Sequence, residues 1–184
     1  MKHSLRLLLL IGVALEVLIF VFSYGLHPEL PDTFKYAARY SGRLSLFVFF
    51  YTFYRYAKDY PKPVGENRQL QNLVILFAVL HLIHWGFLAT NIYLNEIPIV
   101  VVRVLGGALA YAMIIAAPFV LHRIKPLLQL IYFYYVSLVM GLTYWARVKG
   151  DFEGAETTWF HYMGLTIVVV GCVVFGRWIW NASR

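Results

Sequence analysis

Six long apolar stretches, separated by short polar breaks, constrain this chain more than any other feature of its sequence. Each stretch is 20 to 25 residues long, and an α-helix of about 20 residues crosses a hydrocarbon layer of ~30 Å. We expect spans at about residues 5–24, 36–57, 70–94, 97–121, 127–148 and 159–180. The sequence therefore predicts an all-α, polytopic membrane protein, a six-helix bundle in a single integral membrane domain covering residues 1–184.

The composition agrees with a lipid environment and excludes other classes of protein. Apolar residues make up 61% of the chain and charged residues 14%, whereas soluble domains have about 45–50% and about 25%. The single cysteine, Cys172, cannot form an internal disulfide. No metalloprotease, phosphate-loop or serine-hydrolase motif is present. We therefore predict no catalytic residue and no metal site, and any redox role would need a partner.

The net charge of +7 is best interpreted through the preference of Lys and Arg for cytoplasmic loops, and no nucleic-acid partner is expected. If the spans alternate in direction, the two ends of the chain and the second and fourth loops share one side. That side holds ten basic residues: Lys2, Arg6, Arg55, Lys58, Lys62, Arg68, Arg123, Lys125, Arg177 and Arg184. We expect a bacterial-type inner (plasma) membrane, with both termini cytoplasmic.

Three ionisable side chains inside the expected spans are candidates for function, because charges within a membrane are costly and usually face the bundle interior. These are Glu16, Arg43 and Arg103. Glu16 and Arg43 fall at similar depths on antiparallel helices, so we expect them to form an ion pair. A proton relay or substrate contact at Glu16 is the alternative.

The third span carries a polar stripe made of His81, His84, Asn91 and Asn95. The spacing places these residues on one helical face, which we expect to look into the bundle. A neutral imidazole near the middle of a membrane can bind haem iron or a metal. The alternative is a pair of interior histidines that donate or accept hydrogen bonds within the bundle.

Four stretches resemble the ferric-reductase-like transmembrane domain superfamily, most closely the haem-binding membrane subunits that supply electrons to periplasmic methionine-sulfoxide reductases. Tyr40–Leu46 is similar to the opening of the family's second helix, and Phe77–Leu82 to its third-helix segment with a haem histidine. Arg103–Pro118 and Lys125–Val148 resemble its fourth and fifth helices. The resemblance implies a six-helix fold that carries b-type haem.

The chain departs from the family pattern on the fifth helix, where members carry two haem histidines about thirteen residues apart. The matching positions here are Ile131 and Tyr144. His81 alone matches a family ligand. The candidate haem-binding residues are therefore His81, His84 and Tyr144, with His161 as an alternative ligand opposite a histidine of the third helix.

Three functions remain open from the sequence. The one we favour is a haem-free accessory or structural membrane subunit of ferric-reductase-like fold. The second is an electron-transfer subunit with one b haem held by noncanonical ligands. The third is a small proton-coupled transporter or channel that uses Glu16, Arg43, Arg103 and the polar stripe. Besides the lipid bilayer, we expect a protein partner or a second copy of the chain.

Overall fold

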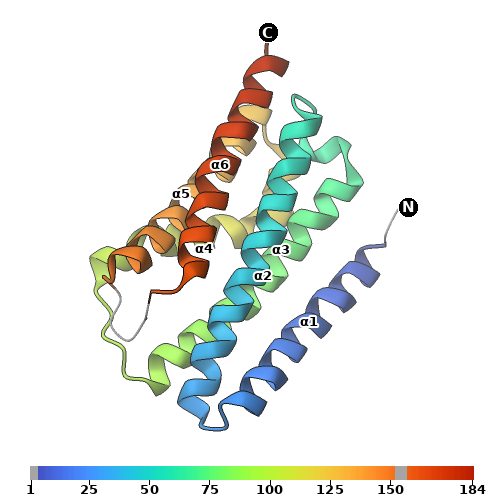
Figure 1. Cartoon of the computed structure of the whole chain (residues 1–184). Helices are drawn as coiled ribbons and strands as arrows, with labels where there is room; N and C mark the ends of the chain where they lie inside the picture. Colours follow the sequence, from blue (N-terminus) through green and yellow to red (C-terminus); the bar gives the residue numbers. More distant parts are fainter. Residues whose placement is uncertain (1–3, 152–156) are drawn as a thin grey trace.

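The computed structural model describes residues 4–151 and 157–184, without the side chains of residues 101–103. Six α-helices and two short 3-10 turns account for most of these residues (Figure 1). The helices are α1 Leu5–Leu26, α2 Leu30–Asp59, α3 Arg68–Leu94, α4 Val101–Val120, α5 Pro126–Lys149 and α6 Trp159–Ala182. The turns are η1 Val64–Glu66 and η2 Leu121–Arg123. The all-α prediction is confirmed for the described part of the chain.

Local sequence signals set the helix ends. The Ser4 hydroxyl accepts a hydrogen bond from the Leu7 amide at 3.3 Å and so caps α1. The side chain of Asn67 accepts from two backbone amides in the first turn of α3. Beyond the end of α5, Gly150 has a φ of 76°, a left-handed conformation that glycine adopts without strain.

Two expected boundaries are wrong, and proline explains both. The second helix begins at Leu30 and not near residue 36, because Pro31 sits in its first turn, where a missing amide is tolerated. The fourth helix begins at Val101 and not at residue 97. Pro98 precedes it, and proline disfavours helical geometry in the residue before it.

Among the residues that the structure describes, five helices are long and apolar enough to cross a membrane, and α2 is not one of them. The expectation of six spans is therefore met only in part. Although α2 has 30 residues, Arg39 and Arg43 interrupt its apolar sequence. Ser41, Ser45 and Thr52 are at most 1% exposed, so α2 keeps polar groups inside the bundle.

The bundle is arranged around α2, which packs against α1, α3 and α6 (Figure 1). Its lower half in this view extends beyond the adjacent end of α6 and contacts α1 and α3. Phe49, Phe53 and Tyr56 of α2 are fully buried. The ring of Phe133 in α5 stacks on Phe53 at 5.1 Å and on Tyr56 at 4.6 Å between ring centres. This aromatic core joins α2 to α5.

A buried glutamine ties the loops at one end of the bundle to α5. Gln129 is fully buried, and its side-chain oxygen accepts a hydrogen bond from the Val64 amide at 3.1 Å. Its side-chain nitrogen donates to the carbonyl oxygens of Leu121 at 2.8 Å and Ile124 at 3.0 Å. The amide thus satisfies backbone groups of η1, of η2 and of the residue that follows η2.

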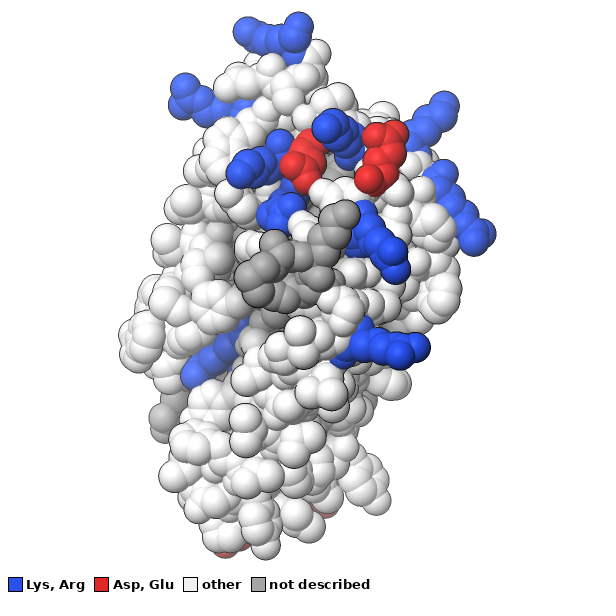
Figure 2. Space-filling model, turned by 90° about the vertical axis from the view of Figure 1, so that its right-hand side faces the viewer, with Lys and Arg blue, Asp and Glu red and all other residues white. Residues whose placement is uncertain are grey.

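Most of the visible Lys and Arg side chains in Figure 2 gather at the end of the molecule where the C-terminus lies in Figure 1. The connection between α2 and α3 lies at the same end. This distribution matches the asymmetry expected from the sequence, in which that end faces the cytoplasm.

The orientation can be tested by labelling single cysteines in a Cys172→Ser background. We expect a membrane-impermeant maleimide to label Asp151→Cys in intact spheroplasts, because the connection from α5 to α6 is predicted to face outward. Lys62→Cys, in the connection from α2 to α3, should react only after permeabilisation. The reverse pattern would contradict the predicted orientation.

Replacement of Gln129 tests the buried amide. Gln129→Leu removes the side-chain partner of one backbone amide and two carbonyl groups, so we expect it to lower the free energy of unfolding by about 3–9 kcal/mol, since each unsatisfied buried group costs about 1–3 kcal/mol. Gln71→Leu is the matched control, because its side-chain bond to the Gly65 carbonyl is exposed and should contribute less than about 1 kcal/mol. Equal effects in denaturant titrations of the detergent-solubilised variants would contradict this role.

Candidate functional site

Glu16 lies in the middle of α1 and faces α2. Its side chain is 1% exposed, and the carboxylate faces the hydroxyl of Ser41 without hydrogen-bond geometry. Neither group has a hydrogen-bond partner among the residues that the structure describes. Nearby, a Cβ atom at Gly12 would lie 2.7 Å from a methyl carbon of Leu76, so glycine lets α1 approach α3 closely.

The expected ion pair between Glu16 and Arg43 is not formed. The Cζ atom of Arg43 lies 4.0 Å from the centre of the Phe160 ring in α6 and 5.1 Å from that of Tyr40. Helical geometry explains the error. Arg43 follows Ser41 by two residues, which turns its side chain about 200° around α2. The two charges share a depth but lie on opposite sides of α2.

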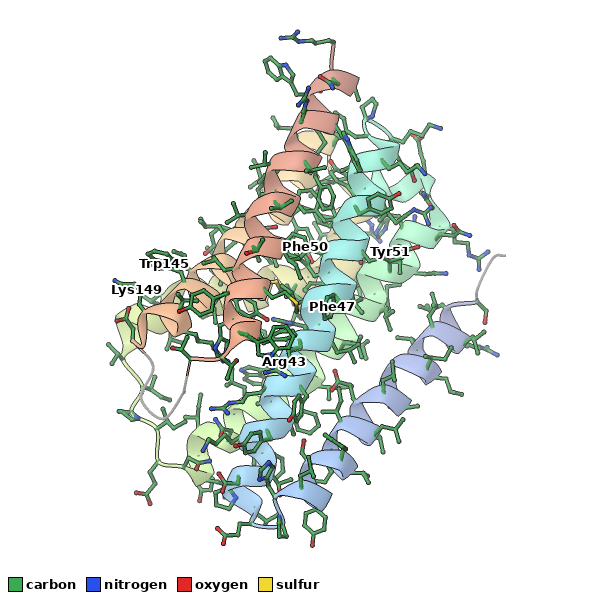
Figure 3. The ribbon with its side chains drawn as sticks, in the orientation of Figure 1. Arg43, Phe47, Phe50, Tyr51, Trp145 and Lys149 are labelled. Atoms are coloured by element: carbon green, nitrogen blue, oxygen red, sulfur yellow. The ribbon has the colours of Figure 1, made fainter. Side chains whose placement is uncertain are left out.

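One face of α2 is directed toward α6. Arg43 and Phe47 are four residues apart and therefore share a helical face; Figure 3 shows both near the lower end of α6, with Phe50 above them. The rings of Phe47 and Phe160 make an edge contact at 6.5 Å between centres. The ring of Phe50 packs against Gly171 of α6. A Cβ atom at this glycine would lie only 2.7 Å from Cε1 of Phe50.

His81 is held by side chains from two other helices. Its Nδ1 atom lies 2.7 Å from the hydroxyl oxygen of Ser45 in α2. The ring of Tyr111 in α4 stacks on the imidazole at 4.7 Å between centres, and Phe77 lies 5.2 Å away. The histidine is therefore an interior side chain that joins α3 to α2 and α4.

His84 occupies the space above Gly42. A Cβ at that glycine would lie 3.0 Å from Cε1 of the imidazole, and the ring also faces the carbonyl of Ala38. The centres of the two imidazole rings are 5.4 Å apart. The Nδ1 atom of His84 is buried and has no hydrogen-bond partner among the described residues.

The rest of the stripe has a structural role at the far end of α3. Asn91 is 7% exposed. The side-chain nitrogen of Asn95 donates a hydrogen bond to the side-chain oxygen of Asn91 at 3.1 Å. The same nitrogen donates to the carbonyl oxygen of Pro31 in α2 at 3.0 Å. As expected, the stripe looks into the bundle, where it faces α2.

Tyr144 lies beside α6. A Cβ at Gly164 would come within 2.5 Å of its ring, so the absence of a side chain at this glycine makes room for the tyrosine. His161 lies 6.4 Å away between ring centres. Its Nδ1 atom accepts a hydrogen bond from the Thr158 amide at 3.1 Å as part of a capping box. Tyr144 therefore groups with His161 and Arg43.

Two arginines that were not among the candidate residues, Arg39 and Arg147, lie near Arg43. Arg39 precedes it by one helical turn, and Arg147 comes from the last turn of α5. All three guanidinium groups lie within electrostatic reach of one another. The spacing of four residues between Arg39 and Arg43 was the available signal. Nothing in the sequence placed Arg147 beside them.

Two features that bear on the site lie outside what the structure describes. The side chain of Arg103 is not described, and neither is the acidic segment of residues 152–156. Within the described part of the chain, no group of three or more His, Cys, Asp or Glu side chains could hold a metal ion.

The described side chains do not fit the family's haem arrangement, which places two axial ligands on opposite sides of one iron. His81 and His84 project from the same face of one helix, and the stacked Tyr111 covers the first. Ile131 is 52% exposed on the outside of α5.

Comparison with protein-family models, with curated proteins and with solved structures finds no match for this chain.

Replacement of Glu16 tests the isolation of its carboxylate. A buried polar group without a partner costs about 1–3 kcal/mol, so we expect Glu16→Leu to raise the free energy of unfolding by that amount. Val17→Leu, at a 55% exposed position of the same helix, should change it little. A loss of stability in Glu16→Leu, measured in the same detergent, would show that the carboxylate has a stabilising partner.

Proposed function

We infer that the chain is a haem-free member of the ferric-reductase-like membrane fold and serves as an accessory membrane subunit. The proposal rests on the two positions of α5 at which members of the family carry haem histidines. Ile131 has no ligand atom and faces outward, and Tyr144 packs against Gly164 of α6. Without ligands from α5, none of the described side chains would oppose His81 across an iron.

The packing around the histidines supports the same proposal. Ser45 engages one nitrogen of His81, and Tyr111 covers a face of the ring. The ring of His84 fills the space above Gly42. A flat macrocycle would need the space that these rings now occupy. The polar stripe then serves to fasten α3 to α2.

The nature of the outer surface supports the accessory role. The outward side chains of α1 and α4 are large and apolar, including Leu10, Leu18, Leu105 and Phe119, each more than 60% exposed. Such a surface suits contact with lipid tails or with the spans of another membrane protein. The proposed subunit acts through a protein partner or a second copy of the chain at this surface.

The second candidate, a b-haem electron-transfer subunit, is favoured by one observation. The Ser45 hydroxyl binds Nδ1 of His81, and iron-ligating histidines commonly have their second nitrogen engaged by such a group. In that case Nε2 of His81 would hold the iron, which would transfer electrons, and Tyr111 would have to move from the ring.

The absorbance spectrum of the purified protein distinguishes the two candidates. After expression with added haem precursor, we expect no Soret band above that of a His122→Ala control, because the described side chains provide no opposed ligands. A stoichiometric Soret band that is lost in His81→Ala/His84→Ala would contradict the haem-free proposal and support the second candidate.

A further inference from the structure

Three polar side chains have buried atoms without a partner at the place where α1, α2 and α3 pack together (Figure 1). Both carboxyl oxygens of Glu16, the hydroxyl of Ser41 and Nδ1 of His84 make no hydrogen bond with the residues that the structure describes. Glu16 is 1% exposed and Ser41 is fully buried. Folded proteins pair the large majority of their buried polar groups, so three unpaired groups from adjacent helices point to a function other than packing.

The packing of α1 on α3 fixes the depth of Glu16. One turn before it, a Cβ at Gly12 would lie 3.2 Å from Cδ2 of Leu80. One turn after it, the ring of Phe20 stacks on that of Phe87 at 5.8 Å between centres. These contacts share one face of α1, so Glu16 faces the segment of α3 between Leu80 and Phe87.

His84 lies within that segment and on the same face as Leu80, four residues further along α3. It reaches α2 as well, because a Cβ at Gly42 would lie only 3.0 Å from Cε1 of its ring. Ser41 precedes that glycine and faces the Glu16 carboxyl group. A carboxyl group, a hydroxyl group and an imidazole thus meet at one depth of the bundle.

None of the described cations pairs with Glu16. Between Arg6 and Tyr24, α1 has no other titratable residue. At a similar depth on α2, Arg43 points to the opposite side, with its Cζ atom 4.0 Å from the centre of the Phe160 ring. The only titratable groups that α3 places near Glu16 are the two imidazoles of the polar stripe.

The other titratable side chains of α2 near this depth contact aromatic rings. The ring of Tyr40 makes an edge contact with Phe22 at 6.0 Å between centres, and the Cζ atom of Arg39 lies 5.2 Å from the centre of the Tyr36 ring. An isolated carboxylate inside a membrane protein is far more costly than a neutral carboxyl group. The neutral form of Glu16, which carries a proton, is therefore favoured.

His84 offers an acceptor for that proton. Its ring donates a hydrogen bond to the carbonyl of Ala38, and because Nδ1 is the nitrogen without a partner, the donor is Nε2 and Nδ1 keeps its lone pair. The neighbouring His81 lies 5.4 Å away between ring centres. Its own Nδ1 atom is already engaged by the Ser45 hydroxyl at 2.7 Å. Of the two imidazoles, His84 is thus the one with an open acceptor at Nδ1.

The lack of hydrogen bonds in this group suits proton transfer. Each unpaired buried group lowers the stability of the fold, and apolar side chains would pack α1 against α2 without that cost. A relay group, in contrast, must exchange one hydrogen-bond partner for another at each step. Chains of acidic and histidine side chains inside membranes mark proton relays.

From this arrangement we propose that Glu16, Ser41 and His84 form an intramembrane proton-transfer site. The neutral carboxyl group of Glu16 holds the proton. In the transfer, the hydroxyl of Ser41 accepts this proton and gives up its own to Nδ1 of His84. The O–H bond of Glu16 breaks and an N–H bond forms, which leaves a carboxylate and an imidazolium. Exchange with water then runs through His84, the only one of the three side chains that is partly exposed.

Infrared spectroscopy of the full chain in lipid bilayers detects the proton directly, because the C=O stretch of a neutral carboxyl group lies apart from the bands of a carboxylate. At neutral pH we expect one such band, which is lost in Glu16→Gln. Glu29→Gln, at an exposed position just before α2, is the matched control and should leave the band in place.

The rate at which this band shifts in D2O tests the transfer to His84. His84→Phe keeps a ring above Gly42 but removes the acceptor, and Ser41→Ala removes the hydroxyl. Each should slow the exchange at least about tenfold, since positioned proton-transfer groups contribute factors of that size or larger. Ser137→Ala, at a buried serine of α5 whose hydroxyl donates to the Phe133 carbonyl, should exchange at the wild-type rate. If His84→Phe does not fold, Ser41→Ala still carries the test.

Three outcomes would overturn the proposal. The first is a wild type without the carboxyl band at neutral pH, because Glu16 would then be ionised. The second is exchange at the wild-type rate in a folded His84→Phe or Ser41→Ala variant, which would leave Glu16 as a buried acid without a relay. The third is equal slowing in Ser137→Ala, which would attribute the effect to the rigidity of the whole bundle.

Discussion

The need to shield the polar groups of α2 from lipid determines the arrangement of the whole bundle. This helix carries Arg39, Arg43 and a series of buried serines and threonines, and it lacks an apolar stretch long enough to cross a membrane unaided. The more apolar helices α1, α3 and α6 pack against it and present their own apolar sides outward. A polar central helix with apolar neighbours reverses the order of a soluble bundle, as a lipid solvent requires.

The rotation of α2 divides its polar contacts into two groups. Ser41 and Ser45 face Glu16 of α1 and His81 of α3. Arg43, on the opposite side, faces Phe160 and the end of α5. The first group lies between α2 and its neighbours α1 and α3 and contributes to the packing of these two helices. The second group places Arg43 beside Phe160 and Tyr144, where α2 meets α6 and the end of α5.

The sequence predicted the helical class and six spans, because apolar runs of this length allow few other structures in lipid. Five of the six expected spans correspond to described helices that could cross a membrane, and the span expected at residues 36–57 does not. The sequence also predicted that the histidine stripe faces the bundle. It could not predict which side of α2 meets which neighbour, because depth along a helix says nothing about rotation. The error over Glu16 and Arg43 arose there. The position of Arg147 beside Arg43, and the contacts of Gln129 with two loops, depend on tertiary packing that no local pattern encodes.

Glycines allow several interior side chains to pack closely against a neighbouring helix. Gly42 receives the ring of His84, and Gly164 receives that of Tyr144. Both pairs come from segments distant in the sequence, so their roles become visible only in the folded chain. In the proposed haem-free fold, these side chains occupy the interior of the bundle in place of a cofactor.

The rotation of α2 turns Arg43 toward α6 and away from Glu16. Solid-state NMR can measure this directly in lipid, as dipolar distances from labelled Cζ of Arg43 to the ring of Phe160 and to the carboxyl carbon of Glu16. We expect a short distance to the ring, near the 4.0 Å between Cζ and the ring centre, and no measurable coupling to the carboxyl carbon. A guanidinium in contact with the Glu16 carboxylate would contradict it.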